Sequence, residues 1–501
     1  MHPLQNGSQV TERPANKPVS GLPGYFTESG ENNVPSYPGA DWFNHVIDEF
    51  KNALSIQGVT FEPESDTNLA AAFSSVYVKS GVDFSAVSEL ISTDLELKVG
   101  IFVRTFYFNA PVLTTWQIVS SGAGDLTDGT VALDNGLYAK IFDSGCISVR
   151  SYGAYGDGQE GGGGNDDTQA WINVINNHSS VCGHLDDIYV LTSPVTRTKS
   201  GCSVYMNGSK VIWRGIAPSP SIIDRDRGVF EFKGTVGSIV ETLQLTSDLK
   251  EFTQEYPITN ASLVSGQRFI RVGSGSLPDA AFNLITVPKS GMVGSSILLD
   301  YINGWDIEPG NFITYQFVDV IEDCFISDFE LIDETSSAEE SDDISGVVFQ
   351  YAHNCHANMV KGKYTNNPLV FGHFCHSCSA SSGYLRDPKK PNEGGKGYVV
   401  QWNNSLYCLS SELRGIGVRH VNDFTQSAYC VVLNSGATDD KGAFITHGSY
   451  EHDLVYYNVK GTVTFANSGA SFGDSSKRIY LERGEGLSHS ALLYGTHFYQ
   501  V

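Results

Sequence analysis

The sequence predicts a mainly β protein in which short strands wind into a column of stacked coils. Three observations predict this fold class. Of 501 residues, 52 are glycine, 11% are aromatic and only 18% are charged, a mixture that favours strands and turns over helices. A strand, a glycine-dense turn and a short helix follow one another at 147–177. Beyond them no long helical pattern occurs, and one motif repeats after 20 residues.

The first 60 residues differ in composition from the rest of the chain. Their start, MHPLQNGSQVTERPANKPVSGLPGYF, is rich in proline and glycine and is not core-forming. It leads into a helix expected at about 41–57. The apolar residues of that helix fall on one face: Trp42, Phe43, Val46, Ile47, Phe50 and Leu54.

Residues 61–146 predict a small mixed domain. The segment TNLAAAFSSVYV favours a short helix or a mixed stretch. KVGIFVRTFYF and LTTWQIV favour strands, and GAGDLTDGT that follows them is typical of a turn.

The segment ISVRSYGAYGDGQEGGGGNDDTQAW, which starts at Ile147, predicts a strand, a turn and a helix start. Gly153 and Gly156 permit the positive φ angles of tight turns. Asp166 and Asp167 can accept hydrogen bonds from free N–H groups at the start of a helix at about 168–177. The first coil of a solenoid would expose its interior and an unpaired strand edge, so we expect this helix to cap it.

The repeat lies in AHNCHANMVKGKY and GHFCHSCSASSGY. A shift of 20 residues pairs His353 with His373, Cys355 with Cys375, His356 with His376 and Tyr364 with Tyr384. Such a period is one coil of a solenoid, in which equivalent residues stack. Cys324, Cys408 and Cys430 continue the series with coils of other lengths, and Asn434 and Asn458 are expected to form another ladder.

Cysteine usage argues against a disulfide framework. The nine cysteines are an odd number on a long chain, so we expect mostly reduced, buried thiols. Cys375 and Cys378 form a CxxC without a second copy, so we predict no metal and no cofactor. The chain shows no signal peptide and no apolar run of 18 residues, which predicts synthesis in a cytosol and no membrane insertion.

The formal net charge of −24 argues against binding nucleic acid through a basic surface. The same charge means that an anionic polysaccharide must be met by a local basic site.

GAYGDG followed by DDT and a helix resembles the entry motif of pectate-lyase-like right-handed β-helices, in particular bacteriophage tailspikes and tail-fibre depolymerases. The extra EGGGG at 160–164 departs from the usual pattern. LPGYFTESG followed by PGADWFNHVIDEFKNAL resembles the amino-terminal virion-anchoring segments of the same proteins. The resemblance implies an anchor at 1–60, a neck at 61–146, a right-handed parallel β-helix at 147–480 and closing strands at 481–501.

The resemblance also implies a function. The chain would be a homotrimeric tail appendage, assembled in the host cytoplasm and joined to phage tail or baseplate proteins through residues 1–60. It would bind a bacterial surface polysaccharide, capsule or O-antigen, and cleave it by hydrolase or lyase chemistry. A non-catalytic receptor-binding or structural fibre on the same scaffold is the alternative.

Histidine is concentrated in one region: seven of 13 lie within 353–452. The spacing of 27 between His420 and His447 predicts that the two stack across coils. The candidate catalytic residues are Arg419, His420, Asp423, His447, Glu451, His452 and Asp453. Carboxylates among them suit glycoside hydrolysis, whereas histidine with arginine suits a lyase. The alternatives are purely structural polar ladders, and a second carboxylate set at Asp319, Glu322 and Asp323.

Overall fold

The structure is a computed structural model that describes most of the chain. The described residues are 40–56, 60, 68, 82–142, 145–215, 226–264, 269–275, 281–289, 294–335, 343–438, 444–465, 476–484, 489–491 and 498–500. They divide into two compact units. The first holds the described residues up to 106, with 113–122 and 132–142; the second holds 107–112, 123–131 and the chain from 145 onward.

The amino-terminal elements begin with α1 (Ala40–Ile56), which matches the helix expected at 41–57. Leu54 is buried, whereas Trp42 and Phe43 are about half exposed. A five-stranded sheet in the order β1-β2-β3-β5-β4 follows. Its strands and the short helix α3 have these bounds: β1 Val82–Phe84, α3 Val87–Ile91, β2 Phe102–Tyr107, β3 Pro111–Val119, β4 Thr130–Ala132 and β5 Tyr138–Ile141.

The two strands expected in 98–119 are therefore confirmed as β2 and β3. The extended start of the chain and most of the segment TNLAAAFSSVYV lie outside the described residues. The boundaries between anchor, neck and solenoid stay predictions. None of the helices in the described ranges is long and apolar enough to span a membrane.

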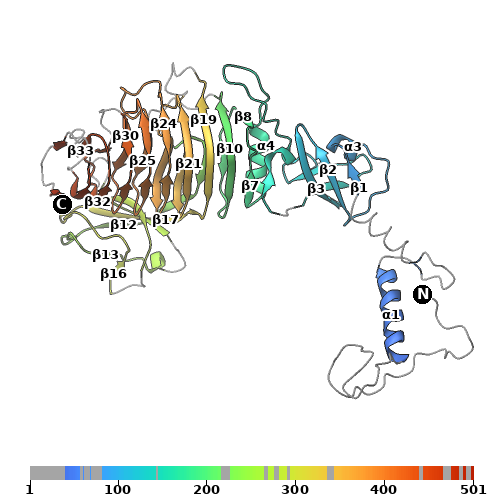
Figure 1. The fold of residues 1–501 in the computed structure, drawn as a ribbon. Coiled ribbons are helices and arrows are strands. Elements are labelled where there is room, and N and C mark those ends of the chain that lie inside the picture. The colour runs from blue at the N-terminus through green and yellow to red at the C-terminus, as the bar shows by residue number, and fades with distance from the viewer. Residues whose placement is uncertain are drawn as a thin grey trace, which may run out of the picture. The chain divides into compact units, whose positions relative to one another are not determined.

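The second unit is a parallel β-helix, so the predicted fold class is confirmed (Figure 1). Its first sheet runs through β6 Ile147–Ser148, β7 Ser180–Cys182, β10 Ser203–Trp213, β19 Phe325–Asp333, β21 His356–Lys363, β23 Ser379–Ser381, β26 Leu409–Ser411, β29 Val431–Leu433, β32 His452–Tyr457, β34 Lys477–Glu482 and β36 Phe498–Gln500. The second runs through β9 Val195–Arg197, β11 Gly228–Lys233, β20 Ser345–His353, β22 Val370–His376, β25 Tyr398–Asn403, β28 His420–Thr425, β31 Phe444–Thr446, β33 Val463–Phe465 and β35 His489–Ala491, with β18 Ile321–Glu322 on β20.

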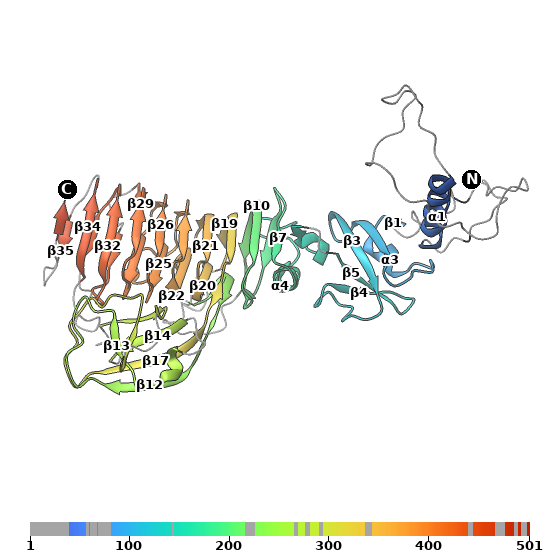
Figure 2. The ribbon, with the colours of Figure 1, turned by 90° about the horizontal axis from the view of Figure 1, so that it is seen from below.

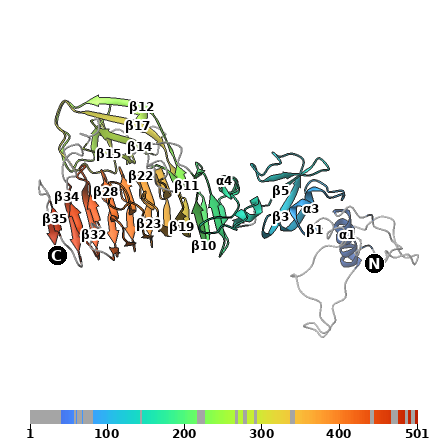
Figure 3. The same ribbon diagram turned by 90° about the horizontal axis from the view of Figure 1, so that it is seen from above.

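A third sheet branches from the first, because the long strands β10, β19 and β21 belong to both sheets. In later coils the two parts separate, and the third sheet continues as β24 Tyr384–Arg386, β27 Arg414–Ile416 and β30 Gly436–Ala437, while β8 Ile188–Leu191 pairs with β10. Every strand pairing in the described parts of these three sheets is parallel, as expected when each strand returns one coil later. Figure 3 shows the strands stacked along the column from β10 to β34.

The entry to the solenoid forms as the sequence predicts. The 3₁₀ helix η1 (Val149–Tyr152) ends at Gly153, which has a φ of 88°, and α4 spans Thr168–Asn177. Asp166 Oδ1 accepts from Thr168 N at 3.0 Å. Asp167 differs from expectation, because its carboxylate accepts from the backbone N–H groups of Tyr155 and Gly156, 2.6 and 3.2 Å away. The carboxylate therefore ties the helix start to the glycine turn.

The 20-residue register of the repeat is wrong by three residues. His353 pairs with His376, and Cys355 N lies 3.4 Å from Cys378 Sγ, so this coil is 23 residues long. The shift of 20 matched identical residue types, whereas the true register is set by a residue in left-handed conformation at each turn. Asn354 and Ser377 hold that position, with φ angles of 50° and 56°.

The predicted cysteine ladder is confirmed for Cys324, Cys355, Cys408 and Cys430. The place of Cys375 in it is wrong, because Cys375 pairs with Ala352 on the second sheet and Cys378 follows Cys355 instead. Six buried, free thiols lie on successive coils of the first sheet: Cys202, Cys324, Cys355, Cys378, Cys408 and Cys430. The Asn434–Asn458 ladder also forms, with Asn458 Nδ2 donating to Asn434 Oδ1 at 2.8 Å. Cys146 and Cys182 are joined in a disulfide at the first coil.

An insertion between β11 and β18 interrupts the solenoid. A four-stranded antiparallel sheet in the order β12-β17-β14-β15 lies on one flank of the column, with a two-stranded sheet β13-β16 beside it (Figure 2). The elements are β12 Thr235–Gln244, β13 Glu255–Pro257, η2 Ala261–Val264, β14 Phe269–Ser274, β15 Asn283–Thr286, β16 Ser296–Leu298 and β17 Phe312–Asp319. Its core includes Tyr256 and Tyr301 and is continuous with Leu406 and Ala428 of the solenoid, so the insertion is docked through apolar packing.

Candidate functional site

The outer face of the second sheet carries a row of polar side chains, one per coil. We call it the polar row: Lys233, Gln350, His373, Asn403, Thr425 and His447. Side chains alternate across a strand, so these residues point away from the solenoid core. Each is partly exposed. Adjacent strands lie about 4.8 Å apart, so the row spans roughly 25 Å.

Near one end of the row, a buried carboxylate holds a histidine. Asp423 is fully buried, and its Oδ1 lies 2.9 Å from Nδ1 of His447. Gln401 Nε2 donates to the other oxygen of Asp423 at 2.7 Å. The side chain of His447 stays 18% exposed. A fixed imidazole beside a carboxylate is the arrangement of a general base.

A second carboxylate–histidine pair lies toward the middle of the row. Asp226 Oδ1 and Oδ2 lie 2.8 and 3.0 Å from Nδ1 of His373, and Gln350 Nε2 donates to Asp226 at 2.8 Å. Both side chains are partly exposed, 20% for Asp226 and 25% for His373. The sequence analysis missed Asp226. It lies 147 residues before its partner, and nothing in its local sequence marks it.

The two pairs face the same strip of surface. His373 is on β22 and Asp423 on β28, two strand spacings away, or about 10 Å. Between them, Asn403 Oδ1 is a buried acceptor without a hydrogen-bond partner in the described part of the chain. Buried acceptors are nearly always satisfied, so this oxygen is an exception within the polar row.

Arg419 and His420 lie at the start of β28. Arg419 Nε donates to His420 Nε2 at 3.3 Å, and its Nη1 donates to Asn392 O at 3.0 Å. His420 is buried, with its ring 4.6 Å from the ring of Tyr398. The predicted stacking of His420 on His447 is wrong, because Phe424 pairs with Thr446 and so places His447 beside Thr425.

Glu451 is fully buried in the turn before β32. Its oxygens accept from the backbone N–H groups of Gln426, Gly448 and Ser449 at 2.9–3.1 Å. Burial raises its pKa to about 7 despite these bonds. The contacts give this carboxyl a structural role in the turn.

His452 and Asp453 lie where the insertion docks on the solenoid. His452 Nε2 lies 2.9 Å from Tyr301 Oη, and its Nδ1 lies 2.7 Å from Asp453 Oδ2. Arg478 donates to both oxygens of Asp453 at 2.9 and 2.6 Å. Burial lowers the pKa of His452, while for Asp453 the bonds from His452 and Arg478 outweigh burial and lower its pKa.

The predicted catalytic residues therefore separate into different environments, and Asp423 with His447 is the pair that lies on the polar row. The alternative carboxylate set is divided between elements: Asp319 ends β17, Glu322 is in β18, and Asp323 accepts from Asn354 Nδ2 at 2.7 Å in the next turn. In the described ranges, no three His, Cys, Asp or Glu side chains converge as a group that could hold a metal ion.

The architecture has a counterpart among solved structures. The chain shares its fold with the tailspike gp49 from Pseudomonas phage LKA1. The TM-score is 0.53 at 11% sequence identity, over 71% of this chain and 63% of gp49. The tailspike gp61 of Pseudomonas phage phi297 matches with a TM-score of 0.46 and 12% identity, over 71% of this chain and 64% of gp61.

The Gp54 tailspike of Acinetobacter baumannii bacteriophage AP22, solved in complex with A. baumannii capsular saccharide, matches with a TM-score of 0.46 and 11% identity, over 71% of this chain and 58% of Gp54. The chain thus spans about three fifths of the length of these solved proteins. No model of a protein family and no curated protein matches the sequence.

Proposed function

We propose that the protein is a phage tailspike that binds a bacterial surface polysaccharide, capsule or O-antigen, and cleaves it along the polar row. The fold shared with a tailspike and the resemblance of the entry and anchor motifs support the binding role. The observation that carries the catalytic role is the presence of two carboxylate–histidine pairs on one outward strip.

The geometry favours acid–base chemistry on a glycan lying across the coils. The row is about as long as several sugar rings, and its amide and hydroxyl groups can bond to sugar hydroxyls. In inverting glycosidases the two carboxyl groups lie roughly 6.5–9.5 Å apart, so that water fits between the base and the sugar. His447 lies three strand spacings from His373, roughly 14 Å, so the two pairs are farther apart than the carboxyl groups of an inverting glycosidase. We assign His447, held by Asp423, as the base, and Asp226 as the second carboxyl group.

In the same proposal, residues 1–60 bind tail or baseplate proteins of a virion. Three copies of the chain form a trimer, which is assembled in the host cytoplasm. The order of the anchor-like helix α1 before the solenoid supports this arrangement. Light scattering on the full chain tests the trimer, with an expected mass three times the 54.4 kDa of one chain.

Purified capsule and O-antigen preparations from a panel of bacteria test the cleavage. New reducing ends indicate a hydrolase, and absorbance from unsaturated uronate indicates a lyase. His447→Ala and Asp226→Asn are expected to abolish cleavage. His356→Ala is the control, because His356 is another outward-facing histidine of the solenoid, bonded to Ser379 Oγ at 2.8 Å on a different sheet. Binding without cleavage across the panel would favour the non-catalytic alternative.

A further inference from the structure

The outer face of the third sheet carries two rows of side chains. In coil order the first is Lys210, Glu330, Lys361, Tyr384, Arg414, Gly436 and Lys460. The second is Ile212, Ile332, Lys363, Arg386, Ile416 and Thr438. We call the six cations of these rows the basic face: Lys210, Lys361, Lys363, Arg386, Arg414 and Lys460.

The basic face is unusual for this chain. The two rows that contain the basic face hold six cations and one carboxylate, although the whole chain has 56 acidic and 32 basic residues. Its amino-terminal part is neutralised: Glu330 lies 3.7 Å from Lys210 and 3.1 Å from Arg386, and Glu160 pairs with Lys363. The uncompensated charge therefore lies farther along the column.

Lys361 and Arg414 carry this charge. They flank Tyr384 on the neighbouring strands, and both are exposed. Neither makes an ion pair with the residues that the structure describes. Arg414 is held in place because its Nη1 donates to Leu413 O and Asn434 O at 2.9 and 2.7 Å. Tyr384 is partly exposed, so its ring offers an apolar platform between two cations.

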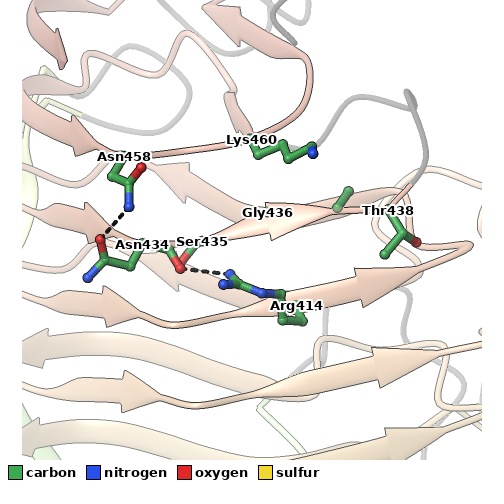
Figure 4. Close-up of a pocket in the computed structure, with 8 residues that line it drawn as sticks. Arg414, Asn434, Ser435, Gly436, Thr438, Asn458 and Lys460 are labelled. Atoms are coloured by element: carbon green, nitrogen blue, oxygen red, sulfur yellow. Dashed lines mark hydrogen bonds between the residues drawn. The ribbon is translucent and has the colours of Figure 1, made fainter. Parts of the chain in front are cut away.

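A hollow of about 430 Å³ adjoins Arg414 at the far end of the basic face (Figure 4). Gly436 lies between Arg414 and Lys460 on neighbouring strands, as Figure 4 shows. A Cβ at this position would lie 3.0 Å from both Cβ and the carbonyl oxygen of Lys460, so the glycine leaves a notch between the two cations. Asn434, Asn458 and Thr438 line the rest, and no carboxylate is among its described lining residues.

We propose that the basic face binds an acidic polysaccharide, with Lys361 and Arg414 contacting the carboxylates of its sugars and Tyr384 stacking on a ring between them. This inference rests on the proposed function and specifies its substrate class. A chain of net charge −24 repels a polyanion over most of its surface, so binding needs a local patch of opposite sign. The basic face is such a patch, and it continues along the column as a linear polymer would.

Nucleic acid is a less suitable occupant. Nucleic-acid sites are strongly basic over a wide surface and stack successive bases on several aromatic rings. In the two rows of the basic face, Tyr384 is the single aromatic residue, and nearby carboxylates neutralise half of the cations.

Calorimetric titration of the full chain at low ionic strength tests the proposal. The probes are a hexamer of galacturonate, the same hexamer after reduction of its carboxyl groups, and a single-stranded deoxythymidine oligomer. The galacturonate hexamer is expected to bind, and its affinity to fall as salt is added. Lys361→Glu combined with Arg414→Glu is expected to weaken binding by about tenfold or more, and carboxyl reduction by a similar factor.

Lys250→Glu is the control for a single charge reversal, because it changes the charge at an exposed lysine of the insertion by the same amount as each of the two substitutions. It is expected to leave the affinity within about twofold. Equal binding of the reduced hexamer, tighter binding of the oligonucleotide, or unchanged affinity in the double variant would overturn the proposal. So would a loss of trimer mass in the double variant, since the face would then be a contact between copies. Polysaccharide cleavage by the His447→Ala variant tests the proposed function separately, because this substitution leaves the basic face intact.

Discussion

Replacing Gly372 with alanine tests the coil register directly. Gly372 lies on β22 and pairs with Trp402 of the next coil. A Cβ at Gly372 would overlap Cε3 and Cζ3 of the Trp402 indole and lie 3.1 Å from Cys375 Sγ. Trp402 is fully buried, so its ring cannot move into open space.

The magnitude follows from the contacts of the indole. Trp402 Nε1 donates to Ser410 Oγ at 2.9 Å, and Ser410 Oγ donates to Asn422 Oδ1 at 2.6 Å. Overpacking a filled core costs about 1–3 kcal/mol, and loss of one hydrogen bond costs about 1 kcal/mol. Alanine also restricts the unfolded chain, which offsets roughly 0.5 kcal/mol. We expect Gly372→Ala to lower the free energy of unfolding by about 1.5–3.5 kcal/mol.

Gly394→Ala is the control. Gly394 is exposed in the loop between β24 and β25, and a Cβ there would meet nothing within 4 Å. Urea unfolding followed by circular dichroism and tryptophan fluorescence gives both midpoints. Trp402→Leu should remove most of the penalty of Gly372→Ala in a double-mutant cycle. If Gly372→Ala unfolds at the same urea concentration as Gly394→Ala, Gly372 does not face Trp402 and the coil register is wrong.

Three further outcomes are expected. Gly304→Ala places a methyl group on the ring of His452, so protease should cut the insertion faster while the urea midpoint of the solenoid changes little. Burial raises the pKa of Glu451 to about 7 from 4.5, so folded protein binds this proton more tightly than unfolded protein. Glu451 should then contribute a fall of about 3 kcal/mol in the free energy of unfolding between pH 4.5 and 8, and Glu451→Gln should remove this contribution at a constant cost. Asp187→Asn should cost about 2–4 kcal/mol, because the carboxylate accepts from Arg150 and from Tyr189 Oη in a buried site.

Matched variants make these outcomes decisive. Asp186→Asn changes the exposed neighbour of Asp187, where a φ of 67° suits asparagine, and should be neutral. Glu412→Gln changes an exposed carboxylate and should keep the wild-type pH profile. Parallel pH profiles of Glu451→Gln and wild type would show that the pKa of Glu451 is the same in the folded and the unfolded protein. If protease cut the insertion of Gly304→Ala no faster than that of the wild type, close packing of the insertion on His452 would be contradicted.

The entry to the solenoid could be predicted because its determinants are local. Gly153 takes a positive φ and Asp166 bonds to the start of α4, both within a few residues of the chain. The insertion could not be predicted, since the strands β12 and β17 alternate like solenoid strands. Whether strands pair parallel or antiparallel depends on where the chain turns, and the side-chain period is the same for both.

The candidate site was partly predictable for a related reason. Asp423 and His447 lie 24 residues apart, one coil, so a search for coil-spaced histidines and carboxylates finds them. Asp226 could not be found this way, because the insertion separates it from His373 by 147 residues. Tyr384 on the basic face was missed because aromatic residues of a solenoid mostly point inward, and only the coil register shows which do not.

The six buried thiols of the cysteine ladder can be used to locate where unfolding of the solenoid starts. A thiol enclosed in the core reacts with an alkylating reagent only when its coil opens. The labelling rate of each cysteine, followed by mass spectrometry, therefore measures how often its coil opens. Cys202 reports on the end nearest α4, and Cys430 reports on coils near the other end. Unequal labelling rates along this series would show from which end the column unravels, without any engineered probe.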